Sequence, residues 1–355
     1  MIKHDRPKIW IQALGVLILL AACSPANAPE DARRQLTIMT HDSFSVSEVV
    51  VQQFESENNV QLVFLQSGDT GAALNRVILT KANPQADLFY GIDNTFLSRA
   101  LEEDIFEPYQ SPLLADVADE FQLDTGHRVT PVDFGDVCIN YDKAYFSEHD
   151  LALPQSLADL TNEAYRGLLV VQNPATSSPG LAFLLATVAE YGPQGYLDYW
   201  SDLRANDVIV VNDWETAYYT NFSASSGQGA QPMVVSYASS PPAEVFFSEQ
   251  PLDQAPTGVL AAPGMCFRQV EFIGILKGTA NLELAQKFVD FMLSPVFQQD
   301  IPLQMFVYPV NTNAALPDVF VRFGDVPAEP ARLDPAEITV NRDDWIQDWT
   351  EVVLR

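Results

Sequence analysis

The sequence predicts an α/β protein with two lobes, each built on an open mixed sheet flanked by helices. Three observations favour this class: the length, the composition and the order of the elements. The chain has 355 residues, enough for two separate cores. Hydrophobic residues make up 47% and charged residues 19%, as in a globular chain. Strand-like and helix-like segments alternate, which is typical of a sheet covered by helices.

The first block of the chain has a β-α-β-α-β pattern. Residues 36–40 alternate like a strand, and a helix with Phe54 on its apolar face follows. Residues 60–65 form a second strand, and a turn and a second helix lead to a buried strand at residues 87–92. Polar segments follow these strands, at the sheet edge where ligands bind in such folds. They are residues 40–43, 67–70 and 93–94.

A second α/β block spans residues 138–265, and the chain then returns to the first lobe. Its expected strands are residues 168–171, 208–211 and 233–237, and its expected helices are residues 181–191 and one that opens near Trp214. The return consists of a strand at 271–276 and one helix at 281–298. We therefore expect lobe 1 at 36–135 and 267–314, lobe 2 at 136–266, and a C-terminal tail at 315–355 that packs on the surface.

The N-terminus has the pattern of an export signal. Basic residues precede a short apolar run that ends in Leu20-Ala21-Ala22-Cys23, the bacterial lipobox pattern. We expect a signal peptide at 1–22, a lipid on Cys23 and a linker at 23–35, with the protein exported to the periplasm or cell surface. The alternative is an ordinary signal peptide that contains a cysteine.

The charge and the missing motifs restrict the function. The net charge is -28, which disfavours nucleic acid and favours cationic partners, although solvated acidic surfaces explain it better than any specific role. The sequence contains no zinc-binding HExxH motif, nucleophile elbow or phosphate loop. We therefore expect neither an enzyme nor a metal or cofactor site.

Nine segments, taken in order, resemble thiamine-binding proteins of ABC importers over roughly residues 36–315. The resemblance implies a two-lobed periplasmic-binding-protein-like fold of type II, with the ligand in the cleft between the lobes. The segments are THDSF (40–44), GDTGAALNR (68–76), NPQADLFYGIDN (83–94), VDFGDVCINYDK (132–143), NPATSSPG (173–180), DWETAY (213–218), SYASSP (236–241), LAQKFVDFMLSPVFQQDIP (284–302) and VYPVN (307–311).

The same resemblance implies a set of ligand-binding residues. They are Asp69, Thr70, Ser177, Ser178, Trp214, Tyr237, Ala238, Ser239 and Ser240. Thiamine has two aromatic rings and a fixed positive charge, so stacking faces, a carboxylate and hydroxyls suit it. The structural alternatives are that Asp69 caps a turn, that Ser177 and Ser178 cap the following helix, and that Trp214 is a core residue.

Three positions depart from the family pattern, and all three make the aromatic cage thinner. His41 replaces a tyrosine, Phe306 replaces a tryptophan and Ala243 replaces a tyrosine. His41 and Phe306 are candidates for further ligand contacts.

Cys138 and Cys266 fall at the two presumed crossovers between lobes. Because the crossovers lie side by side in this fold, the resemblance permits a disulfide across the hinge. Two buried free thiols are the alternative.

The leading hypothesis is a lipid-anchored, monomeric receptor that closes on thiamine, thiamine monophosphate or thiamine diphosphate and delivers it to ABC permease subunits. One alternative keeps the fold but binds ferric iron, because Tyr218 and Tyr219 are adjacent, or binds a polyamine. An exported thiamine-processing enzyme ranks lowest.

Overall fold

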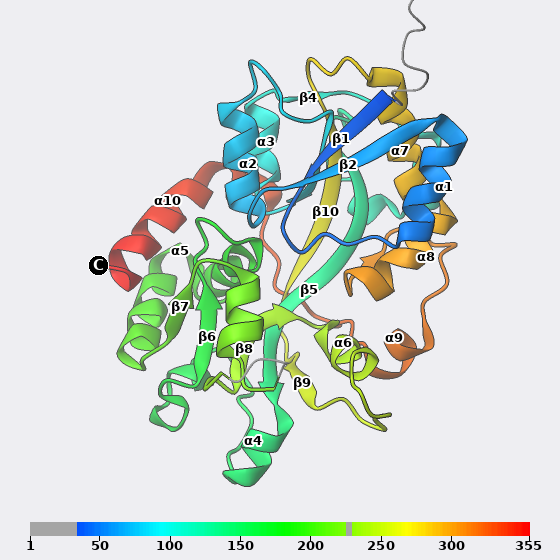
Figure 1. Ribbon diagram of the computed structural model, residues 1–355. Coiled ribbons are helices and arrows are strands. Elements are labelled where there is room, and N and C mark those ends of the chain that lie inside the picture. Colours follow the sequence, from blue (N-terminus) through cyan, green and yellow to red (C-terminus); the bar gives the residue numbers. More distant parts are fainter. Residues whose placement is uncertain (1–33, 225–228) are drawn as a thin grey trace, which may run out of the picture. The chain divides into compact units, whose positions relative to one another are not determined.

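The structure, a computed structural model, describes residues 34–224 and 229–355 and confirms the predicted fold class. In these residues, eleven strands form one curled mixed sheet with helices on both faces (Figure 1). Along its main path the strand order is β2-β1-β3-β10-β5-β8-β6-β7. The predicted signal peptide, Cys23 and nearly all of the linker lie outside the described residues. Among the described helices, none is long and apolar enough to cross a membrane.

The first half of the sheet forms as the local patterns predict. Strand β1 (Arg34–Thr40) pairs in parallel with β2 (Val60–Gln66) and with β3 (Leu88–Asp93). The crossovers are the helices α1 (Glu48–Asn58) and α2 (Thr70–Leu79). Because neighbouring side chains of a strand point to opposite faces, β1 contributes to two cores: Leu36 and Ile38 pack with α1, whereas Met39 packs with α2.

Two long antiparallel strands join the halves of the sheet. Strand β5 (Thr130–Asp142) pairs with β10 (Phe267–Leu276) near its start and with β8 (Met233–Tyr237) near its end. Strand β10 also pairs with β3 in the first half. The sheets expected for the two lobes are therefore continuous through β5 and β10. The expected lobe boundaries, 135/136 and 266/267, fall in β5 and immediately before β10.

The second half contains a short parallel sheet and the longest helix. Strand β6 (Leu169–Gln172) pairs in parallel with β7 (Ile209–Val211) and with β8. Helix α5 (Ser178–Ala205) extends well beyond the predicted residues 181–191, with a kink at Gly192, whose φ is +69°, and Pro193. A π-helical turn, η5 (Thr216–Asn221), follows Trp214, and helix α6 (Ser240–Phe246) follows β8.

The prediction of a single helix at residues 281–298 is wrong. The structure has two helices there, α7 (Leu282–Leu293) and α8 (Pro295–Gln304), separated by Ser294 in an extended conformation (φ -67°, ψ 152°). The break follows from Pro295, because the ring of a proline disfavours helical geometry at the residue before it.

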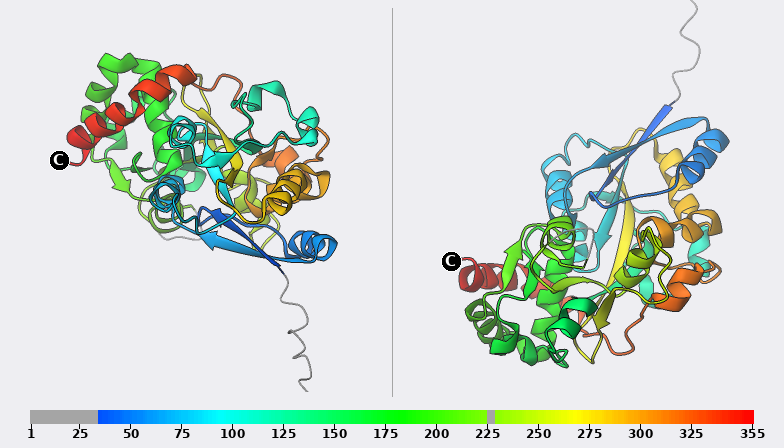
Figure 2. Two further views of the ribbon diagram at one scale, coloured as in Figure 1. Left: turned by 90° about the horizontal axis from the view of Figure 1, so that it is seen from above. Right: turned by 60° about the horizontal axis from the view of Figure 1, so that its bottom comes forward.

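The C-terminal segment is a structural part of the core. In place of the expected surface tail, residues 318–353 contain α9 (Asp318–Phe323) and α10 (Pro335–Val353). Helix α10 packs beside α5 in both views of Figure 2, with Trp349 fully buried against Trp200 at a ring-centroid distance of 5.4 Å. The remaining elements are α3 (Leu97–Glu102), β4 (Phe106–Glu107), η1 (Pro112–Asp116), η2 (Asp119–Phe121), α4 (Lys143–Glu148), η3 (Ala158–Thr161), η4 (Glu163–Tyr165), β9 (Thr257–Leu260) and β11 (Tyr308–Pro309).

The structure joins Cys138 and Cys266 by a disulfide. Cys138 lies in β5 and Cys266 immediately precedes β10, where Phe267 pairs with Val137, so the two Cα atoms are 4.3 Å apart. Such a separation is that of directly opposite residues on antiparallel strands. The bridge therefore ties together the two strands that connect the halves of the sheet.

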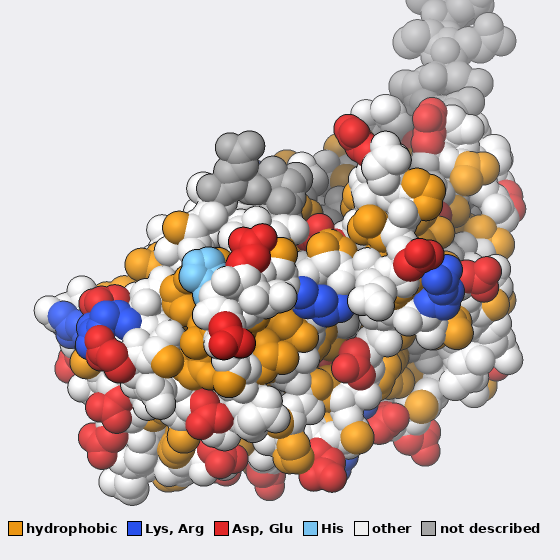
Figure 3. Space-filling model, turned by 90° about the horizontal axis from the view of Figure 1, so that it is seen from below, with side chains coloured by type: hydrophobic (Ala, Val, Ile, Leu, Met, Phe, Trp, Pro, Cys, Tyr) orange, Lys and Arg blue, Asp and Glu red, His pale blue; other side chains and the backbone are white. Residues whose placement is uncertain are grey.

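Acidic side chains are spread over one face of the molecule (Figure 3). On the face drawn in Figure 3 they are scattered among hydrophobic and uncharged side chains, with few Lys and Arg between them. This distribution agrees with solvated acidic surfaces as one source of the net charge of -28.

Candidate ligand-binding site

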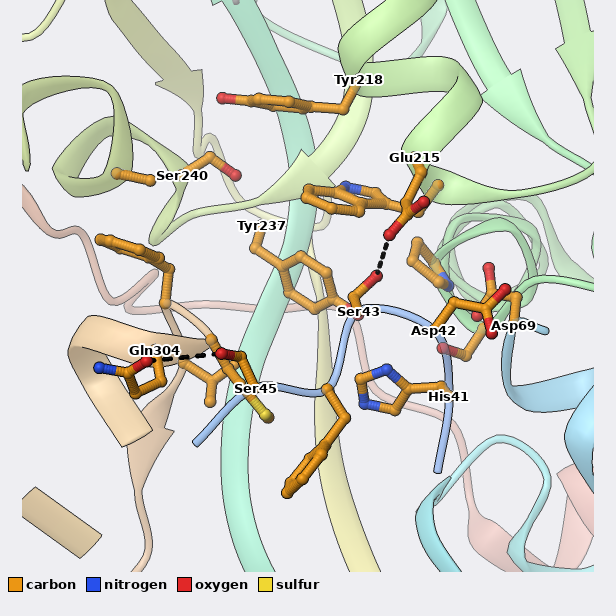
Figure 4. A pocket seen from close by; sticks show the side chains of 18 of the residues that line it. His41, Asp42, Ser43, Ser45, Asp69, Glu215, Tyr218, Tyr237, Ser240 and Gln304 are labelled. Atoms are coloured by element: carbon orange, nitrogen blue, oxygen red, sulfur yellow. Dashed lines mark hydrogen bonds between the residues drawn. The ribbon is translucent and has the colours of Figure 1, made fainter. Parts of the chain in front are cut away.

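A cavity of about 550 Å³ lies where the two halves of the sheet face each other. The first half contributes the loops after β1 and β2, and the second half contributes α5, η5, β8 and α6. The volume falls in the range of pockets that enclose small organic ligands. Figure 4 shows side chains from both halves directed into this space.

Hydrogen bonds hold the first two polar loops together. The Asp42 carboxylate accepts from the Gly68 N–H at 2.8 Å, and the Ser67 N–H donates to the Thr40 carbonyl at 3.0 Å. The ring of His41 packs on Gly91, where an added Cβ would lie 2.3 Å from the ring. The first two polar segments singled out in the sequence, 40–43 and 67–70, therefore meet at the carboxyl edge of the parallel strands.

Asp69 caps a helix and also lines the cavity. Its Oδ1 accepts from the Thr70 N–H at 2.8 Å at the start of α2, whereas the buried Oδ2 makes no hydrogen bond by distance and angle. Burial raises the pKa of Asp69, and Ser177, which lies beside it, offsets part of that rise. Thr70 also lines the cavity, and its hydroxyl donates to the Gly91 carbonyl at 2.9 Å.

The two serines at the start of α5 occupy different places. Ser178 lines the cavity, close to Asp93 and Tyr237. Ser177 is fully buried behind it, does not line the cavity, and makes no side-chain cap to α5. The capping alternative is therefore not what the structure shows for Ser177.

Three aromatic side chains form one wall. The ring of Trp214 stacks on Tyr218 (centroids 5.1 Å apart, 22° between planes) and meets Tyr237 edge-on at 6.4 Å. The indole N–H donates to the Ser236 hydroxyl at 2.9 Å. The Tyr237 ring lies over Gly135, where a Cβ would approach it to 2.9 Å. Trp214 is thus partly core and partly cavity wall.

The segment after Tyr237 divides between the cavity and the interior. Ser240 lines the cavity, with its hydroxyl 2.9 Å from that of Ser236. Ala238 is fully buried beside the disulfide, and Ser239 is fully buried with its hydroxyl donating to the Phe306 carbonyl. Ala238 and Ser239 therefore support the site without lining it.

A cluster of phenylalanine rings at the cavity supplies some of the aromatic surface that the three departures from the family pattern remove. Phe306 lines the cavity with a positive φ of +55°, an uncommon conformation for a residue with a side chain. Its ring lies 5.3 Å from that of Phe247 and stacks on Phe320 at 5.9 Å. Phe247 is 69% exposed at the end of α6. Ala243, the third departure from the family pattern, lines the cavity nearby.

A buried acidic cluster around Glu271, called the floor below, adjoins the cavity, and of its members His41 and Glu271 line it. The Tyr90 hydroxyl lies 2.6 Å from Asp133 Oδ2 and 3.0 Å from Glu271 Oε2, and His41 Nε2 lies 3.7 Å from Glu271 Oε2. Burial and the Glu271 charge raise the pKa of Asp133 far above its usual value. Burial tends to raise the pKa of Glu271 too, but His41 reverses this and the net shift is downward. Burial raises the pKa of Asp93 to about 7.

Sequence reasoning missed several lining residues. Glu271 was assigned only to a strand, although an acid within an apolar strand is itself a signal of a buried charge. Tyr218 was considered only as an iron ligand, and Phe247 gave no signal at all. Among residues 34–224 and 229–355, no three His, Cys, Asp or Glu side chains form a group that could bind a metal ion.

Comparisons with known proteins agree with this architecture. The family described as bacterial extracellular solute-binding protein matches residues 83–321. A thiamine-binding periplasmic protein of Escherichia coli (strain K12) is 32% identical over 346 residues, covering 96% of this chain and 98% of that protein. A thiamine-binding periplasmic protein of Salmonella typhimurium is 30% identical over 350 residues, covering 96% and 98%. A solved periplasmic thiamin binding protein has a TM-score of 0.79 at 29% identity, covering 91% of this chain and 97% of that one.

Proposed function

Because the chain belongs to the bacterial extracellular solute-binding protein family, we propose that it is a periplasmic receptor for thiamine or a thiamine phosphate. The relatives are named as binding proteins and not as enzymes. The observation that supports the ligand best is the cavity itself, which aromatic rings and the carboxylates of Asp69 and Glu271 line together. A flat aromatic cation satisfies both kinds of group.

Each side chain of the proposed site has a defined task. Trp214 and Tyr237 offer ring faces for stacking. The Asp69 Oδ2 atom is available to accept from the aminopyrimidine or to pair with the positive charge. The hydroxyls of Ser178 and Ser240 orient the ligand, and the first N–H groups of α5 suit a phosphate oxygen when one is present.

Closure of the two halves completes the proposal. The ligand would be enclosed by a hinge motion of β5 and β10 and then delivered to ABC permease subunits. One contact between lining residues of the two halves, Ser43 Oγ to Glu215 Oε1 at 3.5 Å (Figure 4), would belong to the closed arrangement. A monomer, and lipid attachment at Cys23, are also part of the proposal and rest on the sequence. Release of a Cys23→Ser variant into the soluble fraction tests the anchor.

Ferric iron is a weaker candidate than thiamine. The Tyr218 hydroxyl donates to Glu244 at 2.7 Å, and burial raises the pKa of Tyr218 and Tyr219. Both effects disfavour the tyrosinate that iron requires. A polyamine matches the acidity of the cavity but makes no use of the aromatic wall.

Calorimetric titration of the domain from Ser24 tests the ligand. We expect saturable binding of thiamine, no heat with ferric citrate and weaker heat with spermidine. Asp69→Asn and Trp214→Ala should each reduce thiamine affinity by about tenfold or more, the range of one lost charge-assisted or stacking contact. Asp142→Asn is the matched control, because Asp142 also caps a helix (α4) but does not line the cavity. Absence of thiamine binding at micromolar concentrations refutes the proposal.

A further inference from the structure

Glu271 is the most buried of the carboxylates that line the described cavity. It is 8% exposed, lines the cavity, and sits at an irregularity of β10, where the pairing with β5 shifts register between Glu271 and Phe272. A bulge of this kind changes the direction of a side chain, and bulges are frequent beside functional sites. An ionised carboxylate in such a place needs a positive partner.

In the structure that partner is His41. Its Nε2 lies 3.7 Å from Glu271 Oε2, and the two side chains are 12% and 10% exposed. The contact is an ion pair without hydrogen-bond geometry, since Nε2 makes no hydrogen bond among the described residues. No Lys or Arg lines the described cavity, so the imidazolium is the cation that this floor provides.

The groups around the pair come from every adjoining element. His41 faces Asp69 at the start of α2, Asp42 in its own loop, and the Tyr90 ring on β3 at 5.6 Å. Glu271 also faces Asp133 on β5, Asp93 on β3 and Tyr237 on β8. Burial lowers the pKa of His41, but Glu271, Asp69 and Asp42 together raise it above its ordinary value.

We propose that Glu271 binds the positive charge of the ligand and that His41 is its counter-ion in the empty protein, so that ligand binding releases a proton to solvent. The inference rests on the proposed binding of a cationic ligand. Before binding, the Glu271 carboxylate is paired with the His41 imidazolium. After binding, the ligand cation pairs with Glu271, His41 becomes neutral, and its Nε2 can accept a hydrogen bond.

The sign of the pH dependence follows from this exchange. Above the pKa of His41 in the empty protein, the imidazole is already neutral and affinity for the cation is highest. Below that pKa each pH unit should weaken binding by up to about tenfold, because one proton must leave for each ligand bound. Protonation of Asp69 and Asp93 acts in the same direction, so a readout specific to His41 is required.

Proton NMR of the histidine ring C–H groups, followed against pH, provides that readout. His41→Gln assigns the signal by its disappearance. In the empty protein, Glu271→Gln should lower the pKa of His41, a result that does not depend on any ligand. Saturating thiamine should lower it in the wild type, whereas the neutral half-molecule 4-amino-5-hydroxymethyl-2-methylpyrimidine should leave it unchanged.

Affinities complete the test and separate the two proposals. Glu271→Gln should weaken thiamine at least about tenfold but change the neutral half-molecule little, the loss expected for one charge pair. Glu283→Gln, an exposed acid of α7 that does not line the cavity, is the matched control, and thermal unfolding checks that both variants fold. An unchanged His41 pKa on thiamine saturation overturns the inference while thiamine binding stands. Absence of thiamine binding overturns the proposed function, and spermidine then serves as the cationic ligand in the same experiment. If spermidine leaves the His41 pKa unchanged, the inference is overturned. The inference is also overturned, whatever the ligand, if Glu271→Gln leaves the His41 pKa unchanged.

Discussion

Gly71 lies in close contact with the other half of the sheet, and its replacement by alanine should weaken ligand binding without weakening the fold. A Cβ built on Gly71 would lie 2.9 Å from the Ala175 carbonyl oxygen and 3.0 Å from that of Thr176. Gly71 is in α2, whereas Ala175 and Thr176 precede α5, so the contact joins the two sides of the cavity. Ordinary contacts of a Cβ begin at 3.4 Å, so the halves must separate by about 0.5 Å.

The expected magnitude follows from two opposing effects. Overpacking against backbone costs roughly 1–3 kcal/mol, and opening of the cavity relieves it. The added Cβ would also lie 3.1 Å from the Phe96 ring in the same half, which a shift of a few tenths of an ångström accommodates. Within α2 alone, alanine favours helix over glycine by up to about 1 kcal/mol. We therefore expect thiamine affinity to fall by about fivefold to a hundredfold while the free energy of unfolding is unchanged or slightly higher.

Calorimetry of thiamine binding and urea unfolding measure the two quantities on the same protein. Gly195→Ala is the matched control, because Gly195 is also in a helix and its nearest neighbour is the Tyr191 side chain at 3.3 Å, away from the cavity. Wild-type affinity in Gly71→Ala, or a loss of stability as large as the loss of affinity, would refute the reasoning.

Three further predictions concern stability, pH and ligand choice. Replacing Cys138 and Cys266 by serine should lower the free energy of unfolding by about 2–5 kcal/mol and leave thiamine binding measurable; urea unfolding with no change contradicts a closed disulfide. The pKa of Asp93 is raised from 3.8 to about 7, so the folded state retains a proton that the unfolded state loses, and stability should fall as pH rises from about 4 to about 7. Asp93→Asn should flatten that part of the curve of unfolding free energy against pH, and an unaltered slope argues against the shift. Because no Lys or Arg lines the described cavity, thiamine should bind more tightly than thiamine diphosphate in calorimetry; the reverse order would show that the N–H groups at the start of α5 compensate for the missing cations.

Local patterns predicted much of the fold because they depend on neighbours in the chain. The alternation of residues 36–40 and the helical spacing in α1 and α2 gave β1, α1, β2 and α2 within a few residues. The predicted helix at 281–298 failed for a local reason too, since Pro295 ends α7 and begins a new helix. Helix α10 was missed because its apolar residues are balanced by polar ones along its length. Only packing against α5 buries Trp349.

Cavity-lining residues could be predicted where a short sequence motif specifies both the residue type and its place at the end of a strand or the start of a helix. Eight of the residues that the resemblance implied as ligand contacts line one cavity: Asp69, Thr70, Ser178, Trp214, Tyr237, Ser240, His41 and Phe306. Ser177, Ala238 and Ser239 lie behind the surface, because adjacent residues at the start of a helix or the end of a strand point in different directions. Whether these residues bind thiamine remains a prediction.

By itself, the sequence determined the class of fold, the order of its elements and the polar loops that end the parallel strands. Those properties depend on hydrophobic periodicity, caps and turns, which act over a few residues. Only the tertiary structure decided that Glu271 of β10 meets His41 after β1, because the strand order and a shift of register bring them together. The charge of the floor likewise depends on burial and on neighbours from β3, β5 and β8, since a buried carboxylate takes its protonation state from whatever the fold places beside it.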